Sequence, residues 1–185
     1  RTELVRAIVA RMSTDPKHLV RTRGPAAAPA FRVRHPFNPR SDVHLTRLSD
    51  PAGLTRMGVN LARVPPGKES FIPHAHTLCE EWVYILEGRG KALLGEREVE
   101  VGPGDFLGFP TDGTVHHLTN TGDVDLVILQ GGERRDGDVG RFPTIGKLGL
   151  VLGDETMRFM SESEIQSLPF SAWLAPPDEP DVTSR

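Results

Sequence analysis

Three histidines and one glutamate of this sequence have a spacing that suits metal binding. His74 and His76 are two positions apart, so in an extended segment both imidazoles point to the same face. Glu81 follows after four residues, which is enough chain to turn into a neighbouring strand, and His116 lies further along as a third imidazole. Three neutral imidazoles and one carboxylate suit Fe(II), Mn(II), Ni(II) or Zn(II), and they leave positions open for water or substrate.

Each of the last two residues has a rival beside it in the sequence. Glu80 would point to the opposite face of the strand from Glu81, so we expect it in solvent or in an ion pair. We favour His116 over His117 because its alternation groups it with Asn120, although a bulge would reverse the face. Asn120 is either a turn residue or a residue that orients a ligand. Glu81 is also the one candidate for a catalytic base.

The elements around these residues read as short strands. Seven apolar or alternating runs occur in the middle of the chain, and turn signals separate nearly all of them. Strands at this spacing predict an all-β sandwich or barrel. The runs are 58–64, 81–86, 91–94, 97–101, 105–109, 116–120 and 125–130.

The two ends of the chain differ from this middle part. Residues 1–50 are expected to form an extension, with an amphipathic helix over 4–12 and a proline-rich arm over 24–39 that holds no regular element. Residues 51–135 would be the barrel with the metal site. Residues 136–185 would be a polar, irregular extension, in which a capping-box pattern at 161–164 predicts a short helix ending at Leu168.

Composition excludes several classes of protein. The chain has 185 residues, enough for one domain, and its net charge of -3 with no long basic run argues against a nucleic-acid partner. Cys79 is the only cysteine, so an internal disulfide framework is excluded. No apolar stretch approaches the roughly 20 residues needed to cross a bilayer. We therefore expect a cytoplasmic protein with no membrane contact and a small-molecule substrate.

The sequence resembles the cupin superfamily in both of the motifs that define it. The first motif, a glycine followed by H-x-H, E and a second glycine, is matched by Gly67, His74, His76, Glu81 and Gly88. The second motif is matched by Gly104, Pro110, Gly113, His116 and Asn120, with one extra residue between the proline and the second glycine. The chain is also similar to a group of bacterial cupins without an established reaction, through the runs 50–54, 58–61 and 65–67.

This resemblance implies a double-stranded β-helix, which is a small jelly-roll barrel. It also implies that His74, His76, Glu81 and His116 hold a divalent transition metal (Fe, Mn, Ni or Zn) inside the barrel, and that the protein forms a homodimer. The function that we expect is a metal-dependent enzyme acting on a small molecule that chelates the metal through two oxygens. Its chemistry would be that of a dioxygenase or of a sugar or sugar-phosphate isomerase. The alternative is a non-catalytic cupin that binds a small molecule or metal as a sensor or carrier.

Overall fold

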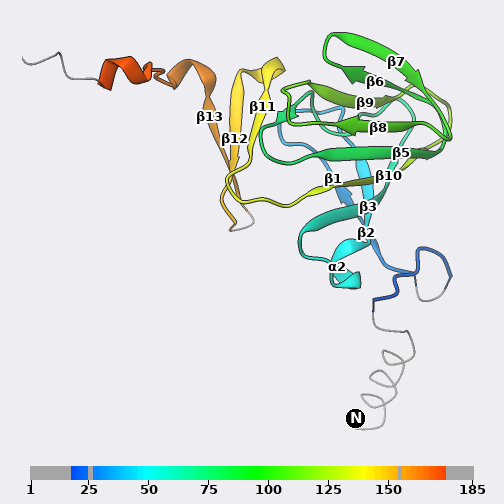
Figure 1. Ribbon diagram of the computed structural model, residues 1–185. Helices are drawn as coiled ribbons and strands as arrows, with labels where there is room; N and C mark the ends of the chain where they lie inside the picture. The colour runs from blue at the N-terminus through cyan, green and yellow to red at the C-terminus, as the bar shows by residue number, and fades with distance from the viewer. Residues whose placement is uncertain (1–17, 25–26, 154–155, 174–185) are drawn as a thin grey trace, which may run out of the picture.

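The computed structural model describes residues 18–24, 27–153 and 156–173, and within them the chain forms three antiparallel sheets (Figure 1). The largest sheet has the order β1 (Ala30–Val33), β2 (Val43–Arg47), β3 (Met57–Val64), β10 (Leu126–Glu133), β5 (Glu81–Glu87), β8 (Phe106–Phe109). A second sheet has the order β7 (Arg97–Val101), β6 (Gly90–Leu94), β9 (His116–Asn120). The third has the order β13 (Met157–Ser161), β12 (Lys147–Val151), β11 (Val139–Phe142), β4 (Ala75–His76).

The first two sheets enclose the core and form the jelly-roll barrel. Alternate residues of each strand point inward, so that Val83 and Ile85 of β5 are buried between the sheets. The same core cluster includes Ile128 from β10, Ala92 from β6 and Leu118 from β9. The fold is therefore all-β, as the sequence predicted. The helical segments among the described residues are short: α2 (Ser49–Ala52) and the 3-10 turns η1 (Pro143–Ile145), η2 (Glu162–Glu164) and η3 (Phe170–Trp173).

The seven strands expected in the middle of the chain are confirmed. They are β3, β5, β6, β7, β8, β9 and β10, and their ends lie within a few residues of the expected ones. The hairpin between β6 and β7 has Gly95 at φ 64°, a conformation that few other residues adopt without strain. The local turn chemistry of the sequence thus sets the register of the barrel strands.

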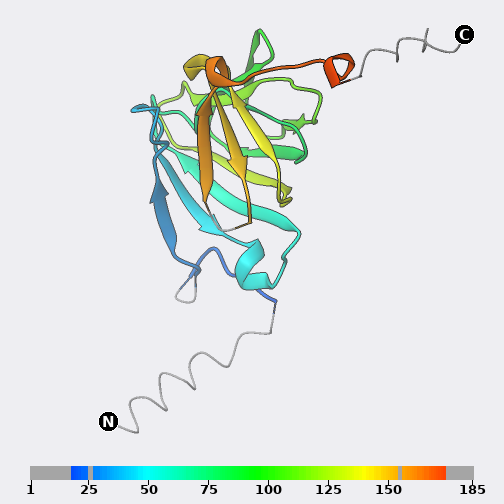
Figure 2. The same cartoon turned by 90° about the vertical axis from the view of Figure 1, so that its left-hand side faces the viewer.

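The flanking segments differ from the expectation in two respects. The arm over 24–39 does hold a regular element, because β1 pairs with β2, which in turn pairs with β3. Much of the described part of 136–161 is regular, because β11, β12 and β13 pair into a sheet beside the barrel, on the side that faces the viewer in Figure 2. The boundaries 1–50, 51–135 and 136–185 stay a prediction, although Val43 and Leu45 of β2 already belong to the barrel core.

The helix expected after Ser161 is also wrong. Ser161 is the last residue of β13, where it pairs with Lys147 of β12, and its side chain makes no capping hydrogen bond. Within the range 162–168 expected to be helical, the structure has one 3-10 turn, η2, which ends at Glu164. Pairing with β12 thus overrides the local capping signal. The amphipathic helix expected over 4–12 lies outside the described residues.

Candidate metal centre

Backbone pairing brings the four residues of the two motifs together. His74 and His116 exchange two backbone hydrogen bonds, His74 N–H to the His116 carbonyl at 3.2 Å and His116 N–H to the His74 carbonyl at 2.8 Å. Residues paired in this way present their side chains on the same face. His76 is paired with Gly140 of β11, and Glu81 opens β5 opposite Phe109 of β8. Strands from all three sheets therefore supply the site.

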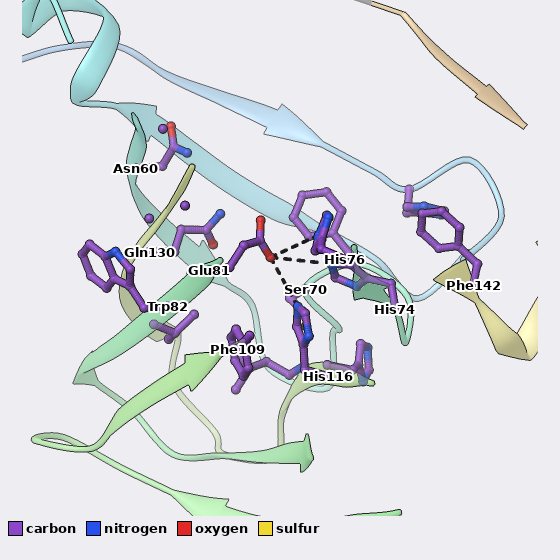
Figure 3. A pocket seen from close by; sticks show the side chains of 18 of the residues that line it. Asn60, Ser70, His74, His76, Glu81, Trp82, Phe109, His116, Gln130 and Phe142 are labelled. Atoms are coloured by element: carbon purple, nitrogen blue, oxygen red, sulfur yellow. Dashed lines mark hydrogen bonds and ion pairs between the residues drawn. The ribbon is translucent and has the colours of Figure 1, made fainter. Parts of the chain in front are cut away.

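The carboxylate of Glu81 lies at the centre of the three imidazoles (Figure 3). Its Oε2 atom is 3.3 Å from His116 Nε2, 3.4 Å from His76 Nε2 and 3.8 Å from His74 Nε2. Two ligands of one transition metal, each about 2.1 Å from it, can be no more than about 4.2 Å apart. The three spacings from Glu81 meet this limit. All four candidate ligand atoms lie within 4.8 Å of one another, so the imidazoles need to move by only about half an ångström to share one ion.

Each imidazole has its other nitrogen turned toward an acceptor. The Nδ1 atom of His74 is 2.7 Å from the Ile72 carbonyl oxygen, and that of His116 is 3.4 Å from the Thr114 carbonyl oxygen. The Nδ1 atom of His76 is 2.5 Å from Asp138 Oδ2. Since carbonyl and carboxylate oxygens accept, each Nδ1 carries the proton, and the neutral ring has its lone pair on Nε2, toward the centre.

Asp138 is the functional residue that the sequence analysis missed. Its side chain is 4% exposed, and its second oxygen, Oδ1, accepts hydrogen bonds from the backbone N–H groups of Leu78 (2.9 Å) and Thr77 (3.2 Å). These bonds fix the carboxylate that orients His76. Asp138 lies 62 positions after His76, just before β11, so only the pairing of β11 with β4 reveals the contact.

Electrostatics divide the site into one cationic and one anionic group. Burial alone would lower the pKa of His76, but the carboxylates of Glu81 and Asp138 raise it to about 9. Burial would raise the pKa of Glu81, yet the three imidazoles around its carboxylate hold that pKa well below its usual range. Burial lowers the pKa of His116. Without metal, a protonated His76 therefore faces an ionised Glu81 at neutral pH.

The rival residues lie elsewhere. Glu80 is exposed, as expected, and His117 turns away from the cluster, with its Nε2 atom 3.4 Å from Glu69 Oε2. Asn120 is fully buried and does not orient a ligand: its amide donates to the carbonyls of Val64 and Val124, and its Oδ1 accepts from the Gly122 N–H. The turn interpretation of Asn120 is the right one. Asn120 is the last residue of β9, and its side chain holds the turn that follows this strand.

Aromatic rings hold the imidazole planes and line a cavity beside them. Phe109 stacks on His116 with ring centroids 4.0 Å apart, and Phe142 stacks on His74 at 5.9 Å. The cavity has a volume of about 480 Å³, and all four candidate ligands line it. That volume lies within the range of about 300–1,000 Å³ found for small-molecule sites.

The residues present fit a transition metal. Among the described residues, His76 Nε2 is one of two buried side-chain nitrogens or oxygens without a hydrogen-bond partner, and it points toward Glu81. A buried nitrogen in this state costs free energy unless it binds a proton donor, an acceptor or a metal. Three imidazole nitrogens and a carboxylate form a donor set that such ions prefer, and the adjoining cavity gives a substrate access to it.

Comparisons with known proteins identify the family. A sequence model described as "Cupin domain" matches residues 60–130. The crystal structure of a proposed sugar phosphate isomerase from Acidithiobacillus ferrooxidans matches with a TM-score of 0.77 and 31% identity, over 83% of this chain and 97% of that one. The chain belongs to the cupin superfamily. The recognition made from its two motifs is thereby confirmed.

Two further relatives add less. A sugar phosphate isomerase from a cupin superfamily, from Silicibacter pomeroyi, has a TM-score of 0.66 at 24% identity, over 74% of this cupin and 88% of that chain, which shows the fold alone. An uncharacterised protein of Methanocaldococcus jannaschii is 43% identical over 68 residues, 37% of this cupin. Those residues span 53% of that protein, about half its length. In the described part of this cupin, no helix has the length and apolarity needed to cross a membrane.

Proposed function

We propose that this cupin is a metal-dependent enzyme acting on a small molecule that chelates the metal through two neighbouring oxygens. The observation that carries the proposal is the cluster of three Nε2 atoms and one carboxylate oxygen at the wall of a 480 Å³ cavity. His74, His76, Glu81 and His116 would hold Fe, Mn, Ni or Zn. When bound, such an ion supplies a Lewis acid that polarises a substrate carbonyl.

The surrounding residues have separate tasks in this proposal. Asp138 keeps the lone pair of His76 turned toward the site, and Phe109 and Phe142 keep water away from the imidazoles. Glu81 was the candidate for a catalytic base. Its lowered pKa makes it a weak base while the imidazoles hold it, so it suits the role of ligand better.

Of the two reaction classes expected, isomerisation has the better support. The Acidithiobacillus ferrooxidans structure, similar over 97% of its chain, is described as a proposed sugar phosphate isomerase, and such a reaction moves a proton at a carbon next to a carbonyl. Dioxygenase chemistry stays a prediction. So do the cytoplasmic location and the homodimer, for which the exposed apolar side chains Tyr84, Leu86 and Phe106 of β5 and β8 offer a surface.

The test begins with elemental analysis of protein purified without chelator or nickel affinity. The wild type and the control His44→Ala, which removes an exposed histidine outside the cluster, should contain about one metal ion per chain, and His116→Ala should lose it. Equal metal in all three proteins, or none in the wild type after reconstitution, would overturn the ligand assignment. The identity of the metal would also choose between oxygen and proton-transfer chemistry.

Catalysis is tested on the same metal-loaded protein. Dihydroxyacetone and 2-hydroxyacetophenone are incubated with it in deuterated water, and NMR follows exchange of the protons next to the carbonyl; an oxygen electrode follows dioxygen uptake. Exchange that disappears in His116→Ala supports the isomerase-type enzyme. Metal binding with neither exchange nor oxygen uptake would instead favour the sensor or carrier.

A further inference from the structure

Resting on the proposed function, we infer that the substrate is an uncharged molecule with a hydroxycarbonyl end and an apolar body, and that it is not a sugar phosphate. The inference comes from the cavity wall. A phosphorylated sugar needs cationic donors and many hydroxyl partners, whereas the wall next to the four candidate ligands offers mainly carbon surface.

Aromatic and apolar side chains make up most of that wall. They come from both sides of the site: Phe109 and Trp82 from the barrel, Phe142, Met157 and Phe159 from the four-stranded sheet, and Phe71 from the segment before β4. Phe142 and Phe159 are themselves in contact, with ring centroids 5.5 Å apart. An apolar body placed against these rings gains free energy by leaving water, and a sugar ring with its hydroxyl groups does not.

The charges at the cavity would repel a phosphate. Among the described residues that line it there is no lysine or arginine, and the carboxylates there are those of Glu81 and Glu133. Two arginines directly after β10 have carboxylate partners of their own: Arg134 pairs with Asp50, and Arg135 with Glu133 at 2.5 Å. Phosphate sites depend on arginine, lysine or the N-terminus of a helix.

The other imidazoles on the wall do not replace those cations. Burial lowers the pKa of His35, which favours its neutral ring, and His117 turns its Nε2 atom toward Glu69 Oε2 at 3.4 Å, so a carboxylate already faces that ring. The Nδ1 atom of His35 accepts a hydrogen bond from the Phe37 N–H at 3.3 Å. His35 is therefore a neutral donor through Nε2, which suits a carbonyl or hydroxyl oxygen.

Two side-chain amides provide an uncharged polar contact. Asn60 of β3 and Gln130 of β10 are directly paired in register, and both line the cavity beside Glu81 (Figure 3). Neither amide forms a hydrogen bond to another described residue. Half-buried amides without partners are suited to hydroxyl and carbonyl oxygens of a ligand. Their place next to Glu81 puts this polar contact at the chelating end of the substrate.

The test compares three hydroxyketones that share one chelating end. Dihydroxyacetone has no further body, 2-hydroxyacetophenone carries a phenyl ring, and dihydroxyacetone phosphate carries a dianion. Isothermal titration of the metal-loaded, full-length protein should give 2-hydroxyacetophenone at least about tenfold higher affinity than either of the others, because burying a phenyl ring contributes more than that factor. Equal or tighter binding of dihydroxyacetone phosphate would overturn the inference, as would binding of none of the three.

Matched variants locate the two contacts. Phe159→Ala should lower the affinity for 2-hydroxyacetophenone several-fold and leave dihydroxyacetone unaffected, whereas the control Phe170→Ala, in η3 and 91% exposed, should change neither. Gln130→Ala should weaken both ligands. An unchanged phenyl preference in Phe159→Ala would contradict the proposed wall. Metal content, measured on each sample, reports separately on the proposed function, so that failure of one proposal is not mistaken for failure of the other.

Discussion

On the barrel side of the candidate metal centre, Glu81 lies flat against the backbone of Gly132, so close that an added Cβ there would be 2.9 Å from Glu81 Cγ. On the other side, His76 lies on the short strand β4 and its ring is oriented by one hydrogen bond to Asp138. One ligand therefore depends on the space that a glycine leaves beside it, and a charged hydrogen bond orients the other. The first depends on the fold as a whole, whereas the second can be changed by a single side chain.

The packing around the two ligands differs in the same sense. Behind Glu81, the side chains of Ile85 and Ile128 are at most 1% exposed, and they belong to the continuous core. The four-stranded sheet next to Asp138 is less buried, and its strand β13 exposes Met157 and Met160 to 41% each. Substitutions at Asp138 or in the four-stranded sheet should thus change the metal affinity and leave the stability of the barrel nearly unchanged.

The largest effect is expected for Asp138→Asn. An asparagine that keeps its oxygen toward the Leu78 N–H must turn its NH₂ group toward His76 Nδ1, which favours the tautomer with the proton on Nε2. Metal affinity should fall about 10- to 100-fold, as for other partners of ligating histidines. A competition titration against a chromophoric chelator measures it.

The control for this substitution is Asp136→Asn, which makes the same chemical change at an exposed position two residues away. It should bind metal like the wild type. Thermal unfolding of both metal-free variants shows whether the fold is intact. An affinity of Asp138→Asn equal to that of Asp136→Asn would mean that the hydrogen bond to His76 does not matter for the site.

The second prediction concerns pH. The pKa of His76 is raised to about 9, so below that pH the metal-free ring is protonated and has no lone pair. Metal must displace this proton, and affinity should rise about tenfold per pH unit from neutral pH to about 9, and then level off. Calorimetry with Mn(II) in buffers of different ionisation enthalpy counts the protons released. An affinity that is flat between pH 7 and 9 would show that His76 is already neutral.

The same proton affects the stability of the metal-free protein. A group whose pKa is raised in the folded state stabilises the fold fully below its unfolded value of 6.5, and this contribution is lost as the pH rises through about 9. Metal removal should therefore destabilise the protein more at pH 9 than at pH 7. The two sides of the site are thus linked. Without metal, the carboxylates of Glu81 and Asp138 stabilise the protonated His76 ring, and the same Asp138 carboxylate orients that ring for metal binding.

The sequence predicted the barrel side of the site better than the side formed by the four-stranded sheet. Buried and exposed residues alternate along β5, where Val83 and Ile85 face the core and Tyr84 and Leu86 face outward, because one face of the strand lies against the core. The parity of His74 and His76, with Glu81 at the start of the next strand, predicted that these side chains would lie together, and they do. That they bind a metal stays a prediction. Local patterns are informative here because burial repeats with the period of the strand.

The four-stranded sheet and Asp138 could not be predicted in this way. The strands β11 and β12 each contain a glycine, Gly140 and Gly149, and pair through them, so their residues show little apolar alternation. Asp138 has no local signature because its partner lies 62 positions earlier. Ser161 has a strong local signature, which pairing with Lys147 overrides. Contacts between distant segments decide this region, and single-sequence patterns do not record them.

The smallest effect is expected on the barrel side, for Gly132→Ala. The new methyl group would lie 2.9 Å from Glu81 Cγ and 3.2 Å from the Glu80 carbonyl oxygen, so the Glu81 side chain must rotate or β5 must shift by a few tenths of an ångström. Because β5 and β10 are packed into the core, we expect the side chain to give way, with a loss of metal affinity below about tenfold and of about 1–3 kcal/mol in stability. The control Gly102→Ala, where an added Cβ meets nothing within 4 Å, should change neither quantity. A Gly132→Ala variant with wild-type metal affinity would show that packing against Gly132 does not position Glu81. The three imidazoles around the carboxylate would then be what holds it in place.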